Sequence, residues 1–245
     1  MRCQPFEPNL RVQLGDCCPP ERATRTYQEA VELAFHQLPL GRRVFEPGEP
    51  EARPYYHALG RLSENQERLG LLEEARQTLR RRLDAFRDAE SQVALGWVLH
   101  RLDRWQEARV HYQRAVDHPV ALFNLAQGHL ARGQVELALT PLLRGLTLNA
   151  RVARYADRPH PGSPWEVAPE TPTPEYAHWY WRRFGAPWTS AQKEFIRLIE
   201  RQPVVRYRLR QIFEKRFRPR VVLFPRHLVA LRRRLDGLHP LVANW

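Results

Sequence analysis

The amino-acid sequence predicts an all-α fold in which helical hairpins follow one another along the chain. Apolar residues between positions 56 and 149 recur at the three- and four-residue spacings of amphipathic helices. This stretch contains three aligned segments, whose alanines Ala75, Ala108 and Ala138 are 33 and then 30 residues apart. The chain has 245 residues, 43% of them hydrophobic, which is enough for a sizeable core without a metal or a disulfide.

The N-terminal segment, residues 1–54, is predicted to contain one helix followed by a loop. Residues 22–38 place their apolar side chains on one helical stripe, and Pro39 and Gly41 end that stripe. Four prolines between positions 39 and 54 then predict an irregular connection. We expect the helix to cap the stack of hairpins; the alternative is that it belongs to a degenerate fourth unit.

Residues 55–149 are predicted to form three hairpins with matching contact positions. In each first helix a leucine precedes a small residue, which lets the partner helix approach closely: Leu62–Ser63, Leu95–Gly96 and Leu125–Ala126. The turns contain residues that tolerate the left-handed conformation ending a helix, namely Gly70, Asp103 and Gly133. A single hairpin cannot bury its apolar face alone, so the units are expected to stack on their neighbours.

The second copy resembles the tetratricopeptide repeat (TPR), a helical-hairpin motif that stacks into a solenoid. The resemblance rests on Leu95-Gly96, Trp105, Ala108, Tyr112 and Pro119, and about 95 residues of the chain share the pattern. The copies depart from it at Gln92, at Arg82, where alanine is usual, and at Pro141 inside the last helix. The resemblance implies a TPR-type solenoid with an N-terminal helix and a basic helical C-terminal region. A generic helical bundle is the alternative.

The resemblance also implies a groove, lined by the first helices of the units, in which a peptide or partner helix lies. The implied groove residues are Glu64, Glu67, Trp97, His100, Arg101, Phe123, Asn124 and Gln127. Trp97 and Phe123 are the candidate anchors, unless the proline-rich segment or the C-terminal helices fold back over them. Members that grip acidic chaperone tails carry Lys, Arg and Asn here, whereas Glu64 and Glu67 favour a basic or mixed ligand.

The remainder of the chain divides into a proline-rich linker and an aromatic, basic region. Residues 150–174 include six prolines between positions 159 and 174, which predict an extended strap or linker, or alternatively a ligand for an aromatic groove. Residues 175–245 begin with an aromatic cluster that includes Trp179 and Trp181. Its helical spacing predicts that it covers the end of the stack; a base-stacking platform is the alternative.

The positive charge of the chain is concentrated at its C-terminal end. The net charge is +12, and residues 191–245 contribute 14 positive and 4 negative side chains. Ordinary surface helices explain this pattern, but so does binding to phosphates or to a membrane surface. The candidate phosphate contacts are Arg206, Arg210, Lys215, Arg216, Arg232, Arg233 and Arg234. The alternative function is therefore a nucleic-acid-associated protein.

The sequence carries no recognisable catalytic or metal-binding motif, so we expect a non-enzymatic interaction module without a cofactor. No phosphate loop, zincin helix or nucleophile elbow occurs, and the three cysteines have no paired spacing. No apolar run approaches the roughly 20 residues of a membrane-spanning helix. The first residues do not resemble a secretion signal. These features predict a cytoplasmic scaffold or adaptor with a protein or peptide partner.

Overall fold

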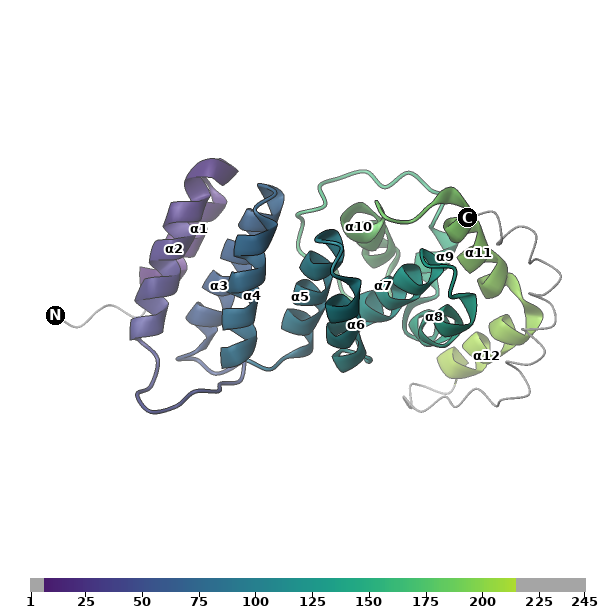
Figure 1. The fold of residues 1–245 in the computed structure, drawn as a ribbon, viewed down its shortest axis with the longest axis horizontal. Helices are drawn as coiled ribbons and strands as arrows, with labels where there is room; N and C mark the ends of the chain where they lie inside the picture. Colours follow the sequence, from purple (N-terminus) through teal and green to yellow (C-terminus); the bar gives the residue numbers. More distant parts are fainter. Residues whose placement is uncertain (1–6, 215–245) are drawn as a thin grey trace. The chain divides into compact units, whose positions relative to one another are not determined.

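The computed structural model describes residues 7–214, with side chains to residue 210, and this part of the chain is all-α. It contains twelve helices and no strand within the described range (Figure 1). The predicted fold class is therefore confirmed. The chain divides into two compact units, unit 1 (Met1–His118) and unit 2 (Pro119–Trp245), and the boundary falls between the second and third predicted hairpins.

Unit 1 consists of three helical hairpins in chain order. The hairpins are α1 (Glu7–Asp16) with α2 (Pro20–His36), α3 (Arg53–Arg68) with α4 (Leu72–Ala85), and α5 (Ala89–Arg101) with α6 (Trp105–Arg114). Helix α2 packs against α3, and α4 packs against α5 (Figure 1). Each hairpin thus covers its neighbour, as expected for units that cannot bury an apolar face alone.

The N-terminal segment forms a complete hairpin, because a helix precedes the predicted one. The predicted helix corresponds to α2, but α1 was not foreseen and the expectation of a single helix was wrong. Gly15 at the end of α1 lies directly against the ring of Tyr27, with no room for a Cβ atom. The Tyr27 hydroxyl donates to Asp16 Oδ1 at 2.7 Å. A glycine opposite a buried tyrosine therefore holds the first hairpin together.

In the second predicted copy a glycine likewise lies against a tyrosine ring, between α5 and α6. A Cβ atom added at Gly96 would lie 2.8 Å from Cε1 of Tyr112, which is fully buried. The tight turn between these helices places Asp103 at a φ of 56°, and Gly70 has a φ of +76° at the equivalent turn between α3 and α4. The small-residue column and the left-handed turns are thus where the sequence predicted them.

Arg82 departs from the repeat pattern, and the structure shows how so large a side chain fits. Its guanidinium carbon lies 3.8 Å from the centre of the Tyr56 ring. Gly60 leaves space beside it, since a Cβ atom there would lie 3.4 Å from Arg82 Nη1. The Nη2 group reaches Glu90 Oε1 at 3.4 Å. The buried guanidinium of Arg82 is therefore accommodated by the Tyr56 ring and the Glu90 carboxylate, and by the absence of a side chain at Gly60.

Unit 2 contains the third hairpin and a helical C-terminal region. The hairpin is α7 (Pro119–Leu130) with α8 (Val135–Asn149), and α8 continues through Pro141. Four helices follow: α9 (Arg151–Arg154), α10 (Pro174–Phe184), α11 (Ser190–Arg201) and α12 (Pro203–Glu214). Helices α9, α10 and α11 pack together, and α12 contacts both α8 and α11. The third predicted hairpin is present, and the C-terminal region packs on it.

The aromatic cluster belongs to the core of unit 2. Tyr176, Tyr180, Trp181 and Phe184 on α10 are all buried. Trp181 donates through its indole nitrogen to the carbonyl oxygen of Val152 at 2.7 Å. Since these rings are packed inside the unit, the core interpretation of the cluster holds and the base-stacking platform does not.

The proline-rich segment is a strap that is bonded to α10. Arg182 donates to the carbonyl oxygens of Pro161 and Ser163, at 2.6 and 3.2 Å. Trp179 donates through its indole nitrogen to the carbonyl oxygen of Glu166 at 3.0 Å. These hydrogen bonds attach the extended segment to α10, although the segment itself forms no helix or strand.

A histidine of this strap, His160, lies against His178 of α10 and is expected to make the stability of unit 2 sensitive to acid. His160 Nδ1 lies 3.0 Å from His178 Nδ1. Burial, followed by the charges of His178 and Lys193, lowers the pKa of His160 to about 4. The unfolded chain binds a proton near pH 6.5 and the folded chain does not. We expect the free energy of unfolding to fall as the pH drops from about 6.5 to about 4. Urea titrations across that range should show a flatter pH dependence of the free energy of unfolding for His160→Gln than for the wild type.

Candidate partner-binding groove

The predicted groove residues fall in both units. Glu64 and Glu67 lie on α3, and Trp97, His100 and Arg101 lie on α5, all in unit 1. The other three lie on α7 in unit 2: Phe123, Asn124 and Gln127. The two sets have different surroundings and are described separately.

In unit 1 a buried carboxylate links α3 to α5. Glu67 is 5% exposed, and its Oε1 accepts a hydrogen bond from Trp97 Nε1 at 2.7 Å. The same oxygen accepts one from Arg101 Nη1 at 3.0 Å. Trp97 is buried as well. Its predicted role as an exposed anchor is therefore wrong: the indole nitrogen is used to satisfy a charge inside the unit.

Of the remaining groove residues in unit 1, His100 packs among aromatic rings and Glu64 lies partly at the surface. The ring of His100 lies among those of Trp97, Trp105 and Tyr112, with centroids 6.2, 5.3 and 6.3 Å away. The side chain of Glu64 is about a third exposed and accepts from Arg61 Nη1 at 2.8 Å. Both acidic groove residues are thus already ion-paired within the chain, and this weakens the charge argument against an acidic ligand.

In unit 2 the predicted anchor Phe123 is a core residue. It is fully buried, and its ring centroid lies 5.5 Å from that of Tyr180 on α10. Behind it, a Cβ atom on Gly145 of α8 would lie only 3.2 Å from Phe123 Cζ. Phe123 therefore fills the space between its hairpin partner and the C-terminal region, and the prediction of an exposed anchor is corrected here as well.

The polar groove positions on α7 are also taken by the C-terminal region. Asn124 accepts a hydrogen bond from the Tyr180 hydroxyl at 3.0 Å, and that hydroxyl accepts one from Trp188 Nε1 at 3.1 Å. Gln127 donates to the carbonyl oxygen of Pro187 at 2.9 Å. The sequence left open whether the C-terminal helices cover the groove. On α7 they do, and residues 176–188 occupy the face where a ligand was expected.

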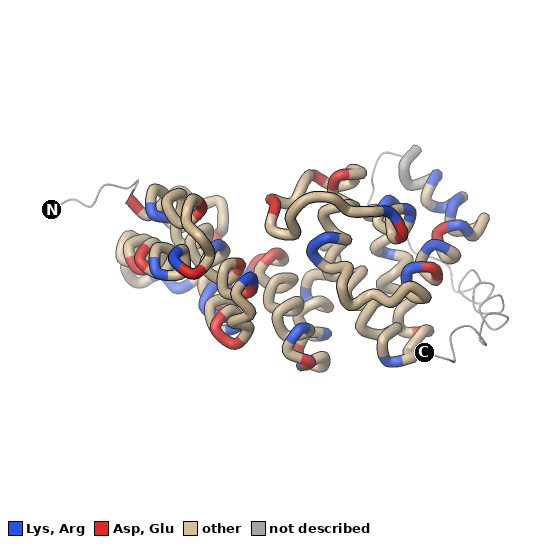
Figure 2. The backbone as a smooth tube through the Cα atoms, turned by 90° about the horizontal axis from the view of Figure 1, so that it is seen from above, with Lys and Arg blue, Asp and Glu red and all other residues tan. Residues whose placement is uncertain are grey.

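The candidate phosphate contacts are described for Arg206 and Arg210 only. Both lie on α12, where Val205 and Leu209 form the buried face; Figure 2 shows the basic residues spaced along this part of the chain. The other candidates lie outside the described residues: Lys215, Arg216, Arg232, Arg233 and Arg234.

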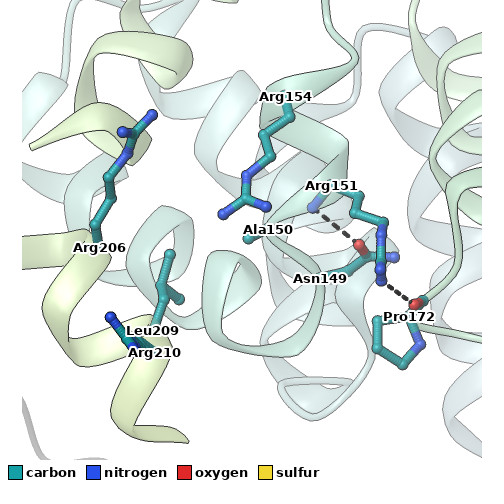
Figure 3. A pocket seen from close by; sticks show the side chains of 8 residues that line it. All are labelled: Asn149, Ala150, Arg151, Arg154, Pro172, Arg206, Leu209 and Arg210. Atoms are coloured by element: carbon teal, nitrogen blue, oxygen red, sulfur yellow. Dashed lines mark hydrogen bonds between the residues drawn. The ribbon is translucent and has the colours of Figure 1, made fainter. Parts of the chain in front are cut away.

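Arg206 and Arg210 line a pocket of unit 2 together with two arginines that sequence analysis missed. These are Arg151 and Arg154 on the one-turn helix α9 (Figure 3). The three-residue spacing of Arg151 and Arg154 places both near one helical face, but nothing in the sequence indicated that α12 lies opposite.

Within residues 7–214, no three His, Cys, Asp or Glu side chains are grouped so that they could hold a metal ion. No helix of the described part of the chain is both long and apolar enough to cross a bilayer.

The paired, consecutively packed helices define a protein of the helical-hairpin repeat class. The Tetratricopeptide repeat family model matches residues 89–114, which span α5 and α6, and residues 119–140, which span α7 and the start of α8. The matched residues are thus TPR-type repeats, and repeats of this family generally mediate protein–protein interaction. A search of curated proteins gives no significant match.

Proposed function

We propose that this chain is a non-enzymatic cytoplasmic adaptor that binds a peptide or partner helix along α3 and α5 of unit 1. The observation that carries the proposal is the difference between the two sets of groove residues. The α7 positions are occupied by residues 176–188, whereas Glu64 and Arg101 keep about a third of their side-chain surface exposed. Unit 1 therefore offers polar groups at the positions where the repeats of this family bind partners.

The chemistry of this face favours a ligand of mixed charge. The side chains of Arg61 and Glu64 are each about a third exposed and pair with one another, and Arg68 one turn further along α3 is exposed. Arg101 on α5 adds a further positive charge, which lies 3.0 Å from the buried carboxylate of Glu67. A ligand of mixed charge can exchange the partly exposed Arg61–Glu64 pair for intermolecular pairs at little cost, because a surface pair contributes only about 0–1 kcal/mol.

Selection of peptides from a displayed library on the full chain tests the proposal. Glu64→Lys reverses one charge of the face and should shift the selected peptides from basic to acidic residues at one position. The matched control is Glu74→Lys, an exposed residue on the second helix α4, which should leave the selection unchanged. Trp97→Ala and Phe123→Ala are unsuitable probes because both side chains are buried. Identical selections with both charge variants would refute binding at this face.

A further inference from the structure

We propose that the arginine-lined pocket of unit 2 binds a small organic ligand that carries a phosphate group. The pocket has a volume of about 430 Å³ and lies where α8 ends, beside α9 and α12. Figure 3 shows Arg154 extending into it from α9, while Arg206 and Arg210 approach from α12. Four arginines and no acidic residue are among its lining side chains.

A buried carboxylate behind the pocket positions two of these guanidinium groups. Glu200 on α11 is 2% exposed, and its Oε1 accepts a hydrogen bond from Arg154 Nε at 2.7 Å. Its Oε2 lies 3.7 Å from Arg206 Nη2. One carboxylate therefore holds arginines from two helices near one another, although their charges repel. The bond uses one of the five N–H donors of Arg154.

Arg151 is fixed in a similar way at the other side of the pocket. Its guanidinium donates to the carbonyl oxygen of Pro172, and its backbone N–H donates to Asn149 Oδ1 at 3.1 Å. Arginines that are already held in place lose less side-chain entropy when they bind a ligand. Arg151 and Arg154 are therefore held in place before any ligand arrives.

The chemistry of the lining favours phosphate over other anions. The guanidinium groups of Arg154 and Arg206, held near one another by Glu200, provide pairs of N–H donors that match the oxygens of a phosphate, and the four arginines of the lining supply charge for a dianion. Leu209, Ala150 and Pro172 supply an apolar wall for the organic part of the ligand. The volume lies within the range of small-molecule sites. A nucleic-acid strand instead needs a groove that follows several nucleotides.

Titration calorimetry on the full chain at about 0.15 M salt, where the Debye length is about 8 Å, tests this site. The probes are inorganic phosphate, pyrophosphate and a nucleoside diphosphate. We expect saturable binding with one site per chain. Arg154→Gln and Arg206→Gln should each weaken it about tenfold to a hundredfold, because each removes charge-assisted hydrogen bonds. Both side chains are about half exposed, at 51% and 56%, and each variant leaves the buried Glu200 the other arginine as a partner, so the variants are expected to fold.

The control is Arg87→Gln, an exposed residue of unit 1 that changes the net charge equally. Binding that survives in Arg87→Gln and is lost in both pocket variants supports the site. Three results would overturn it: no binding of any of the probes, equal weakening by Arg87→Gln, or retention of binding in both pocket variants. Binding of a single-stranded RNA but of none of the small phosphates would also overturn it, in favour of nucleic acid as the ligand of these arginines.

Discussion

Replacement of Tyr180 by alanine is expected to lower the free energy of unfolding of unit 2 by about 3–5 kcal/mol. The side chain is fully buried and its ring packs on Phe123. Its hydroxyl also donates to Asn124 and accepts from Trp188. The substitution therefore leaves a cavity and removes the partner of two buried polar groups at the same time.

Urea unfolding of Tyr180→Ala and Tyr180→Phe separates these two contributions. The phenylalanine variant keeps the ring and removes only the hydroxyl, so it should cost about 1–3 kcal/mol. If Tyr180→Ala were no less stable than Tyr180→Phe, the packing of α10 on α7 would be refuted. Amide exchange in α7 should become faster in the alanine variant, because this helix loses its cover.

Glu67→Ala is expected to cost unit 1 about 2–4 kcal/mol, because it removes a buried charge that serves two helices. The indole N–H of Trp97 would lose its acceptor at 2.7 Å, in a buried position. Arg101 would lose its carboxylate at 3.0 Å, but its side chain is 36% exposed and can turn to water. Most of the cost therefore arises at Trp97.

Two further variants provide destabilisations with which that of Glu67→Ala can be compared. Glu67→Gln keeps an acceptor for Trp97 and should recover a large part of the loss. Glu64→Ala removes a partly exposed carboxylate of the same helix and should cost less than about 1 kcal/mol. Thermal unfolding of the three variants is the measurement. Equal destabilisation by Glu64→Ala and Glu67→Ala would contradict the bonded link between α3 and α5.

The three repeated hairpins could be predicted from sequence because local contacts specify them. A small residue such as Gly96 and a large one such as Tyr112 meet across a short turn, so both partners lie within one recognisable segment. Helix α1 could not be predicted in this way. It buries only Pro8 and Gly15, so its sequence shows no apolar stripe. Its packing against α2, rather than its own sequence pattern, stabilises it as a helix.

The surroundings of the groove residues could not be predicted, because they depend on contacts between distant segments. The register predicted that Phe123 faces away from its own hairpin, but its ring packs on Gly145 of α8 as well as on Tyr180. The hydrogen-bond partner of Asn124, Tyr180, lies 56 residues further along the chain. The arginine pocket has the same origin. Arg154 and Glu200 are 46 residues apart. Counting charged side chains along the chain placed the positive charge in residues 191–245 and gave no indication of a basic pocket at α9.

A double-mutant cycle at Gly96 and Tyr112 tests whether the hairpins pack through matched columns of small and large residues. Gly96→Ala places a Cβ atom 2.8 Å from the Tyr112 ring. Combination with Tyr112→Leu reproduces the pair at the equivalent positions of the third hairpin, Ala126 and Leu142. Any gain in helix propensity from Gly96→Ala is the same in both backgrounds and cancels in the cycle.

Urea unfolding of the wild type, the two single variants and the double variant gives the coupling free energy between the two positions. If the columns pack in this way, the double variant is less destabilised than the sum of the two single effects, by at least about 1 kcal/mol. Additivity of the two substitutions within about 0.5 kcal/mol would contradict it.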